Sequence, residues 1–310
     1  MDYHIGLAFS IEQISYVIFE SPGMMISAVG TVAYPFSYEE DIFTQQEARI
    51  SLTSVLRNTL DTIKFKPKSL SLSIESNLAV LNRITYPENL EETGITDLIT
   101  WHLSESLNLP LSEYVNVRST NISKRDKYNE ELVISVQKKI LHFFRNIAED
   151  LEIPLRNLTV HHLAAELALN SALSEQIEKL MILCKIAPNR LESSFFFNGT
   201  YYKSHYEHVQ PANSSADFHS DLVNKIKQEI GYIENLLAAD GSEQMPVDRL
   251  LLYGPVLDDA LLTMIQKNMS IPVDRFNPLQ NITVSDHLLP TLTEENASQY
   301  VECIGAAMDQ

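Results

Sequence analysis

One pair of residues near the middle of the chain has the types and spacing of metal ligands. His162 and Glu166 are four residues apart, so a helix would place both side chains on one face, and imidazole and carboxylate groups both bind zinc. A zinc site needs more than two protein ligands, however, and the sequence shows no further His or Cys cluster beside them. We therefore interpret the pair as neighbours on a helix face and expect no metal site.

Two other groups of residues have chemistry that a structural role explains better. Asp258 and Asp259 follow Gly254-Pro255 and carry the oxygen ligands that Mg²⁺ prefers, but in the first turn of a helix they would complement the helix dipole. Three consecutive aromatic residues, 195–197, have rings that could stack on a base. They end an expected strand just before a tight turn at Asn198-Gly199, so we expect them to pack in a sheet.

The chain lacks the glycine-rich loops that hold phosphate groups in many nucleotide-binding proteins. Such loops need glycine because backbone N–H groups must approach the anion closely and adopt positive φ angles. The nine glycines are scattered, and the closest two, Gly23 and Gly30, are seven residues apart. No G-x-G-x-x-G or G-x-x-x-x-G-K-[ST] pattern occurs, and no Ser/His/Asp or Cys/His set has the context of a catalytic motif. The sequence therefore predicts no catalytic residue and no cofactor.

The composition is that of a globular protein with an excess of acidic residues. With 310 residues, of which 45% are hydrophobic, the chain is long enough for about two domains. Its formal net charge of −18 argues against nucleic-acid binding, which needs a basic surface. Residues 231–310 hold three basic and twelve acidic residues, which account for half of that net charge. This excess favours solubility or, alternatively, attraction to a basic partner such as the tail of a membrane protein.

Several features favour a cytoplasmic protein. Residues 1–4 offer no basic start of a signal peptide, and no apolar run approaches the roughly 20 residues that cross a bilayer. The two cysteines, Cys184 and Cys303, form no metal-binding or redox pattern. We therefore expect a cytoplasmic chain with no direct insertion into a membrane.

Alternation and short apolar runs predict an α/β chain in which one unit occurs twice. The first unit has strands at 4–9, 14–20 and 25–33 and a helix at 44–64, and the second has strands at 179–186, 191–197 and 200–208 and a helix at 217–238. Between them we expect strands at 70–74, 78–85, 114–119, 131–136 and 157–160 and helices at 90–107, 137–150 and 162–173. The last expected elements are strands at 249–253 and 272–276 and helices at 257–269 and 294–308. This duplication is typical of two similar α/β domains.

The order of these elements resembles the PilM-type proteins of type IV pilus assembly. The most specific segment is SLSIESNLAVLNRITYPENLEETGITDLITWHLSESLNLPLSEYVNVRS, residues 71–119. It is similar to the family's inserted subdomain, and the matching positions are Arg83, Pro87, Ile99 and Trp101. His102 stands where the family usually has a glutamate. The segment ELVISVQKKILHFFRNIAEDLEIPLRNLTVHHLAAELAL and the terminal residues 300–307 are also similar to the family.

The resemblance implies an actin-like, or ribonuclease H-like, α/β fold. These proteins share it with the cytoplasmic domain of the type II secretion protein GspL. A first actin-like domain would span 1–175, with an inserted small α+β subdomain at about 71–152. A second actin-like domain would span 176–310, with its last helix returning toward the first.

The resemblance also implies where a nucleotide would bind, and the residues at those positions lack the groups that the family uses. In the first phosphate hairpin, Ala8 and Ser10 stand where the family usually has aspartate and glycine. In the second, Lys185 and Ala187 replace the acidic residue and the glycine, while Gly254 alone remains of the glycine pair in the adenosine loop. We therefore expect a pseudo-ATPase that neither binds nor hydrolyses ATP.

The function that the resemblance implies is binding rather than catalysis. PilM-type proteins hold the short cytoplasmic N-terminus of a single-pass inner-membrane partner of the PilN kind, so this chain would be peripheral to the inner membrane. We expect Leu98, Trp101 and Tyr114 near the groove that holds this tail. Two alternatives stay open: a divergent actin-like ATPase or sugar-kinase relative, and an actin-like adaptor of cell division or of the envelope outside pili.

Overall fold

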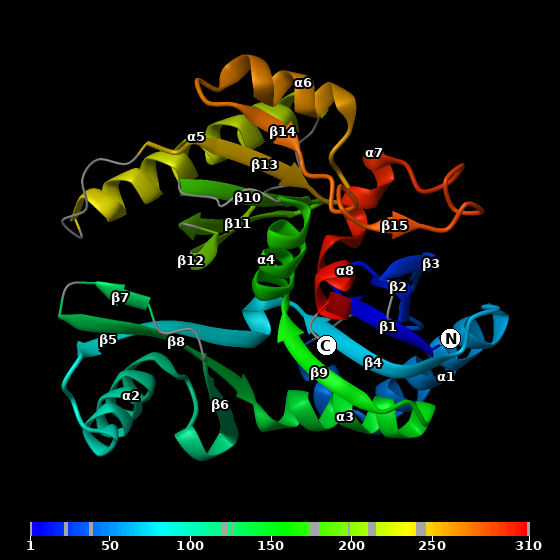
Figure 1. The fold of residues 1–310 in the computed structure, drawn as a ribbon, viewed down its shortest axis with the longest axis horizontal. Helices are drawn as coiled ribbons and strands as arrows, with labels where there is room; N and C mark the ends of the chain where they lie inside the picture. The colour runs from blue at the N-terminus through cyan, green and yellow to red at the C-terminus, as the bar shows by residue number, and fades with distance from the viewer. Residues whose placement is uncertain are drawn as a thin grey trace.

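In the described part of the chain, three β-sheets organise the structure, and helices pack against them (Figure 1). The computed structural model describes residues 2–21, 24–36, 40–119, 123–125, 127–173, 180–197, 199–209, 215–239 and 246–308. In Figure 1 a five-stranded sheet lies at the top, a six-stranded sheet at the lower right and a small sheet at the lower left.

The six-stranded sheet is centred on β1, which runs antiparallel to β2 and parallel to β4. Its order is β15-β3-β2-β1-β4-β9, with bounds Asp2–Phe9 (β1), Ile14–Ser21 (β2), Met25–Val32 (β3), Pro67–Ile74 (β4), Leu155–Val160 (β9) and Thr283–Val284 (β15). Ile5 and Leu7 face one hydrophobic core and Ala8 faces another. Because both faces are covered, the strand is apolar almost throughout and does not show the alternation of a half-exposed strand.

Helices cover both faces of this sheet. On one face α1 (Gln46–Thr62) and α3 (Lys138–Leu151) share a core with the strands. On the other face α4 (His161–Ala172) and the final helix α8 (Val301–Met308) lie side by side, as the green and red helices at the centre of Figure 1 show. Their approach requires glycine, because a Cβ atom added to Gly305 would lie 1.7 Å from the carbonyl oxygen of Ala164. The last helix therefore returns to the sheet that contains the first strand.

The five-stranded sheet repeats the meander of the first. Its order is β12-β11-β10-β13-β14, with bounds Leu180–Ala187 (β10), Arg190–Phe197 (β11), Thr200–His208 (β12), Arg249–Tyr253 (β13) and Val273–Arg275 (β14). Two helices, α5 (Ser215–Ala239) and α6 (Asp259–Asn268), lie beside it at the top of Figure 1. Gly199 has a φ of 74° in the turn before β12, whereas Asn198 lies outside the described residues. The predicted pair of similar sheets is confirmed.

The small sheet consists of β5 (Ala79–Pro87), β6 (Tyr114–Arg118), β7 (Ser123–Arg125) and β8 (Tyr128–Gln137), with α2 (Glu92–Ser106) against one face. The expected pairing of 114–119 with 131–136 is confirmed, since Val117 lies opposite Ile134. The sheet occupies a narrower range than the expected inserted subdomain at 71–152. This is because β4 pairs with β1 and α3 packs in the core of the six-stranded sheet. We propose 79–137 as the inserted unit.

Short helical turns connect the larger elements. They are η1 (Glu40–Thr44), η2 (Ser76–Leu78), η3 (Leu111–Glu113), α7 (Glu294–Ala297) and η4 (Ser298–Tyr300). Thr293 caps α7, since its side chain accepts from the Asn296 N–H and the Asn296 side chain accepts from the Thr293 N–H. Of the helices in the described part of the chain, none is both long enough and apolar enough to cross a membrane.

Candidate functional site

The degenerate nucleotide-site positions identified in the sequence come together where the two large sheets meet. Ala8, Ser10, Lys185 and Gly254 line one pocket of about 120 Å³, between the turn after β1 and the end of β10. Ala187 is fully buried at the end of β10, next to the turn. Pockets for small molecules and cofactors usually have volumes of about 300 to 1,000 Å³, so this pocket is too small for a nucleotide in the conformation described.

A lysine ion pair occupies one side of this pocket. The Nζ atom of Lys185 lies 2.7 Å from a carboxylate oxygen of Glu302 on α8, and both side chains are buried. Burial alone would lower the pKa of Lys185, but the carboxylates of Glu302 and Glu192 raise it above its usual value, so the lysine is charged. Burial and the charge of Lys185 hold the pKa of His161 well below its usual value. The neutral imidazole therefore accepts from Lys185, with 3.4 Å between Nδ1 and Nζ.

An arginine at the start of β11 connects the two large sheets. Arg190 is fully buried, and its guanidinium donates to three carboxylates: Glu12 at 3.0 Å, Glu75 at 2.6 Å and Glu192 at 2.6 Å. We call these four residues the Arg190 cluster. Glu12 lies in the turn between β1 and β2, and Glu75 directly follows β4, so both belong to the six-stranded sheet. Arg190 therefore bridges the two halves of the molecule at the position of the expected phosphate hairpins.

The pKa values of two carboxylates of the Arg190 cluster, Glu75 and Glu192, are shifted in opposite directions. Burial raises the pKa of Glu75 to about 7, although the charge of Arg190 opposes this shift. Burial opposes ionisation of Glu192 as well, but Lys185 and Arg190 hold its pKa below its usual value. One oxygen of Glu75 also accepts from the backbone N–H of Ile11 at 2.6 Å. Internal cations and a backbone N–H thus take the places that a metal ion or water would take around these carboxylates.

The retained glycine of the expected adenosine loop has a structural role. Gly254 has a φ of 117°, in the region that favours glycine, and an added Cβ atom would lie 2.4 Å from the carbonyl oxygen of Ile186. The backbone conformation and the close approach to β10 both require glycine at this position. Its presence therefore does not indicate a nucleotide contact.

The other candidate ligands identified in the sequence have structural partners. His162 is buried, its Nδ1 atom lies 2.5 Å from the Ser194 hydroxyl, and burial lowers its pKa to about 4. Asp258 caps α6 by accepting from the Leu261 N–H at 2.7 Å, as its position at the helix start predicts. Phe195 and Phe196 are fully buried, which confirms their role in packing. Within the described ranges no group of three His, Cys, Asp or Glu residues is placed to hold a metal ion.

The cavity beside the small sheet is an open groove of about 640 Å³, which we call the β9 groove. Its floor is the face of the small sheet opposite α2, formed by alternate residues of β6 and β8 that include Val117 and Ile134. Its walls are β9, through residues 157–160, and α4, through Leu163 and Glu166. Figure 1 shows β9 running between the small sheet and the rest of the six-stranded sheet. A groove of this size and openness can hold an extended segment of chain.

Arg83 lines the β9 groove and connects two of the sheets around it. It projects from β5, and its guanidinium lies 2.5 Å from the Glu130 carboxylate and donates to the backbone oxygen of Tyr201 at 3.0 Å. It also lies over the ring of Tyr202, 4.9 Å from the ring centre. These contacts attach the small sheet to β12 of the five-stranded sheet, so both large sheets and the small sheet contribute to the groove.

The three residues expected near the partner's tail do not line this groove. Trp101 is 58% exposed on α2, Tyr114 is buried, and Leu98 packs on the core beneath α2. Partner contact at these positions stays a prediction.

The residues that do line the groove could have been found in the sequence. The run Leu132-Val133-Ile134 is apolar on both faces of its strand. Val133 is buried beneath α2, while Leu132 and Ile134 face the groove.

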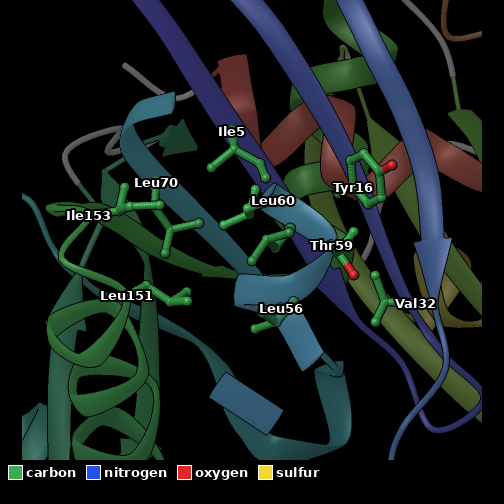
Figure 2. Close-up of a pocket in the computed structure, with 10 residues that line it drawn as sticks. Ile5, Tyr16, Val32, Leu56, Thr59, Leu60, Leu70, Leu151 and Ile153 are labelled. Carbon is green, nitrogen blue, oxygen red and sulfur yellow. The ribbon is translucent and has the colours of Figure 1, made fainter. Parts of the chain in front are cut away.

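A second apolar cavity is too small for a ligand. It lies between the six-stranded sheet and α1, where Ile5, Leu60 and Leu70 converge (Figure 2). Its volume is about 10 Å³, at the lower limit for a single water molecule. The hydroxyl of Thr59 on its wall already donates to the backbone oxygen of Val55, so the cavity offers no open polar group from that residue.

Comparison with known proteins supports the fold. No family model and no curated protein matches the sequence. Among solved structures, a chain of the "PilM-PilN type IV pilus biogenesis complex" has a TM-score of 0.79 at 10% identity, covering 98% of this chain and 97% of that one. The ethanolamine utilization protein EutJ from Carboxydothermus hydrogenoformans has a TM-score of 0.51 at 9% identity, covering 100% of this chain and 90% of that one. The inorganic polyphosphate/ATP-glucomannokinase from Arthrobacter sp. strain KM has a TM-score of 0.50 at 10% identity, covering 100% of this chain and 98% of that one.

These similarities show the fold, because the sequence identities are about 10%. The predicted actin-like α/β architecture is confirmed, and so is the resemblance to PilM-type proteins at the level of fold. The chain has the fold of the solved chain from the PilM-PilN complex over nearly its whole length.

Proposed function

We propose that this chain is a non-catalytic, actin-like scaffold of a type IV pilus or type II secretion-like assembly platform. In this function it holds the cytoplasmic N-terminal tail of a single-pass inner-membrane protein of the PilN kind, and it is peripheral to the membrane through that partner. The observation that carries the proposal is the contrast between the two cavities. The pocket lined by the expected nucleotide positions has a volume of about 120 Å³, while the β9 groove beside the small sheet is open and about 640 Å³.

The chemistry of the smaller pocket supports a role without catalysis. Mg²⁺ needs oxygen ligands, and the buried carboxylates at this position are paired with Lys185 and Arg190. A nucleotide would have to displace the ion pairs that these carboxylates already form. The main alternative is an enzyme, since a glucomannokinase shares the fold. The internal pairing of these charges argues against an enzyme.

The shape of the larger groove supports the binding of a peptide. Pockets and sheet edges are the features by which proteins hold extended chain segments, and the β9 groove offers both. An adaptor outside pili would use the same groove for a different tail. The identity of a short single-pass membrane protein encoded beside this chain would separate these two scaffold functions.

A calorimetric titration tests the proposal. The probe is a synthetic peptide of the cytoplasmic N-terminal residues of the single-pass membrane protein encoded beside this chain. We expect it to bind the wild-type chain, and we expect Val117→Gln, at a groove residue that is 54% exposed, to weaken binding about tenfold. Ile50→Gln is the matched control, because Ile50 is 53% exposed on α1 and does not line the groove. A tail that does not bind, or equal affinities for the two variants, would overturn the proposal.

A further inference from the structure

The floor of the β9 groove is lined by side chains, whereas one of its walls is lined by the main chain of a strand. A strand that faces a groove contributes every second residue to it, as β6 does through Val115 and Val117. β9 instead contributes the four consecutive residues 157–160. The main-chain edge of β9 therefore lines the groove. In the sheet formed by the described residues, β9 is the last strand on this side, next to β4.

The β9 groove is lined by more acidic than basic side chains. The lining has one cation, Arg83, and two carboxylates, Glu130 and Glu166. Arg83 forms its ion pair with Glu130. No salt bridge among the described residues involves Glu166, which projects from α4 beside Leu163 and Leu167. The groove thus has a carboxylate with no ion-pair partner of its own.

Burial makes the charge of Glu166 costly. It raises the pKa of this carboxyl to about 7, although a backbone hydrogen bond from Tyr201 and the charge of Arg83 oppose the shift. A cation placed beside the carboxylate would favour its ionised form. The stem of a lysine or arginine side chain could meanwhile lie along the apolar residues of α4.

Resting on the function proposed above, we infer that the occupant of the β9 groove is an extended segment that pairs with the edge of β9 and places one lysine or arginine beside Glu166. Its main chain adds a strand to the six-stranded sheet, and alternate side chains face Val117 and Ile134 on the floor. An extended segment with one basic residue complements both the main-chain edge of β9 and the carboxylate of Glu166.

Selection from a random library of 12-residue phage-displayed peptides tests the charge. The full chain, its Glu166→Gln variant and its Glu105→Gln variant are used as separate targets. Glu105 is an exposed carboxylate on α2 outside the groove, so this control removes the same charge elsewhere. We expect a lysine or arginine at one fixed register among peptides selected on the wild-type chain and the control, and at least tenfold loss of that enrichment on Glu166→Gln. Equal basic content on all three targets, or no selection of basic residues on the wild type, would overturn the inference.

N-methylation tests the pairing with β9. In a peptide selected on the wild-type chain, each backbone amide is methylated in turn, which removes one donor at a time. We expect every second methylation across the bound segment to weaken binding at least tenfold, because alternate amides of an added strand face its neighbour. Uniform effects along the peptide would contradict strand addition.

The peptide library tests the inference about the groove, and the membrane-protein tail tests the proposed function, so the two can fail independently. A library in which wild-type binders lack a basic residue refutes the inference, whatever the affinity of the tail. A tail that fails to bind, together with strand-like basic library peptides that bind in the groove, refutes the proposed function and leaves the chemistry of the groove intact. Melting temperatures of both glutamine variants within a few degrees of the wild type ensure that folded proteins are compared.

Discussion

The ammonium of Lys185 lies 2.7 Å from the carboxylate of Glu302, and both residues line the pocket between the two large sheets. Lys185 belongs to β10 of the five-stranded sheet, and Glu302 belongs to α8, which packs on the six-stranded sheet. The pair therefore connects the two halves of the fold. Together with the Arg190 cluster, it places paired buried charges where the two large sheets meet.

The first prediction concerns the stability that Arg190 contributes. Replacing Arg190 by Met leaves Glu75 and Glu192 buried without their shared cation, and breaking a buried ion pair costs about 3–5 kcal/mol. Urea denaturation of the variant should show a loss of this size in the free energy of unfolding. The control is Arg249→Met. Arg249 is partly exposed and lies 3.7 Å from Asp274, so we expect a loss below about 1 kcal/mol. Equal small losses in the two variants would mean that the Arg190 cluster does not hold the sheets together.

A second prediction concerns the contact between α4 and α8. Gly305→Ala would place a Cβ atom 1.7 Å from the carbonyl oxygen of Ala164, so one helix must move, and such overpacking costs about 1–3 kcal/mol or more. Gly231→Ala is the matched control in α5, because an added Cβ atom there meets nothing within 4 Å. That substitution should raise the free energy of unfolding by about 0.5–1 kcal/mol through helix propensity. The same change in stability for both variants, measured by urea denaturation, would contradict the described packing.

The third prediction is a pH dependence that comes from Glu166. Its pKa is about 7 in the folded chain and near 4.5 when exposed, so between these values the folded state binds more protons than the unfolded state. The contribution of this group to the free energy of unfolding is therefore greatest below about pH 4.5 and is lost as the pH rises to about 7.

Chemical denaturation at pH 5 and pH 7.5 measures this contribution. The wild-type chain should lose more stability between the two pH values than Glu166→Gln, which has no proton to release at this position. The Glu105→Gln variant, changed at an exposed residue, should behave like the wild type. Identical pH dependence in the wild type and Glu166→Gln would show that Glu166 titrates normally and is not buried in the groove wall.

Much of the fold could be predicted from local sequence patterns. The apolar runs at 4–9 and 179–186 predicted strands that the structure places at the centres of two similar sheets. The short strand β15 gave no signal, because two residues are too few to show a period. The boundaries of the inserted subdomain were harder to predict, because the alternation of β4 predicts a strand but not the sheet that it joins.

The candidate sites were harder to predict because their residues are far apart in the chain. Glu12, Glu75 and Arg190 come from three separate segments, and only the pairing of the sheets brings them together. The one local sign was the spacing of Arg190 and Glu192, two residues apart on one strand, which places both charges on one face. In the groove, Glu166 was considered as a metal ligand because of its spacing from His162, while its neighbours across the groove could not be known.

The central claim is that this actin-like chain has lost its nucleotide site, and a calorimetric titration with ATP and Mg²⁺ tests it most directly. Ala8 supplies no carboxylate to organise the metal, and Lys185 is held by Glu302. We expect no binding heat and no change in melting temperature at millimolar nucleotide. A ligand at 100 times its dissociation constant would add about 2.7 kcal/mol to the free energy of unfolding. A dissociation constant below about 100 μM, accompanied by the rise in melting temperature that such linkage requires, would contradict the claim and favour an ATP-dependent enzyme.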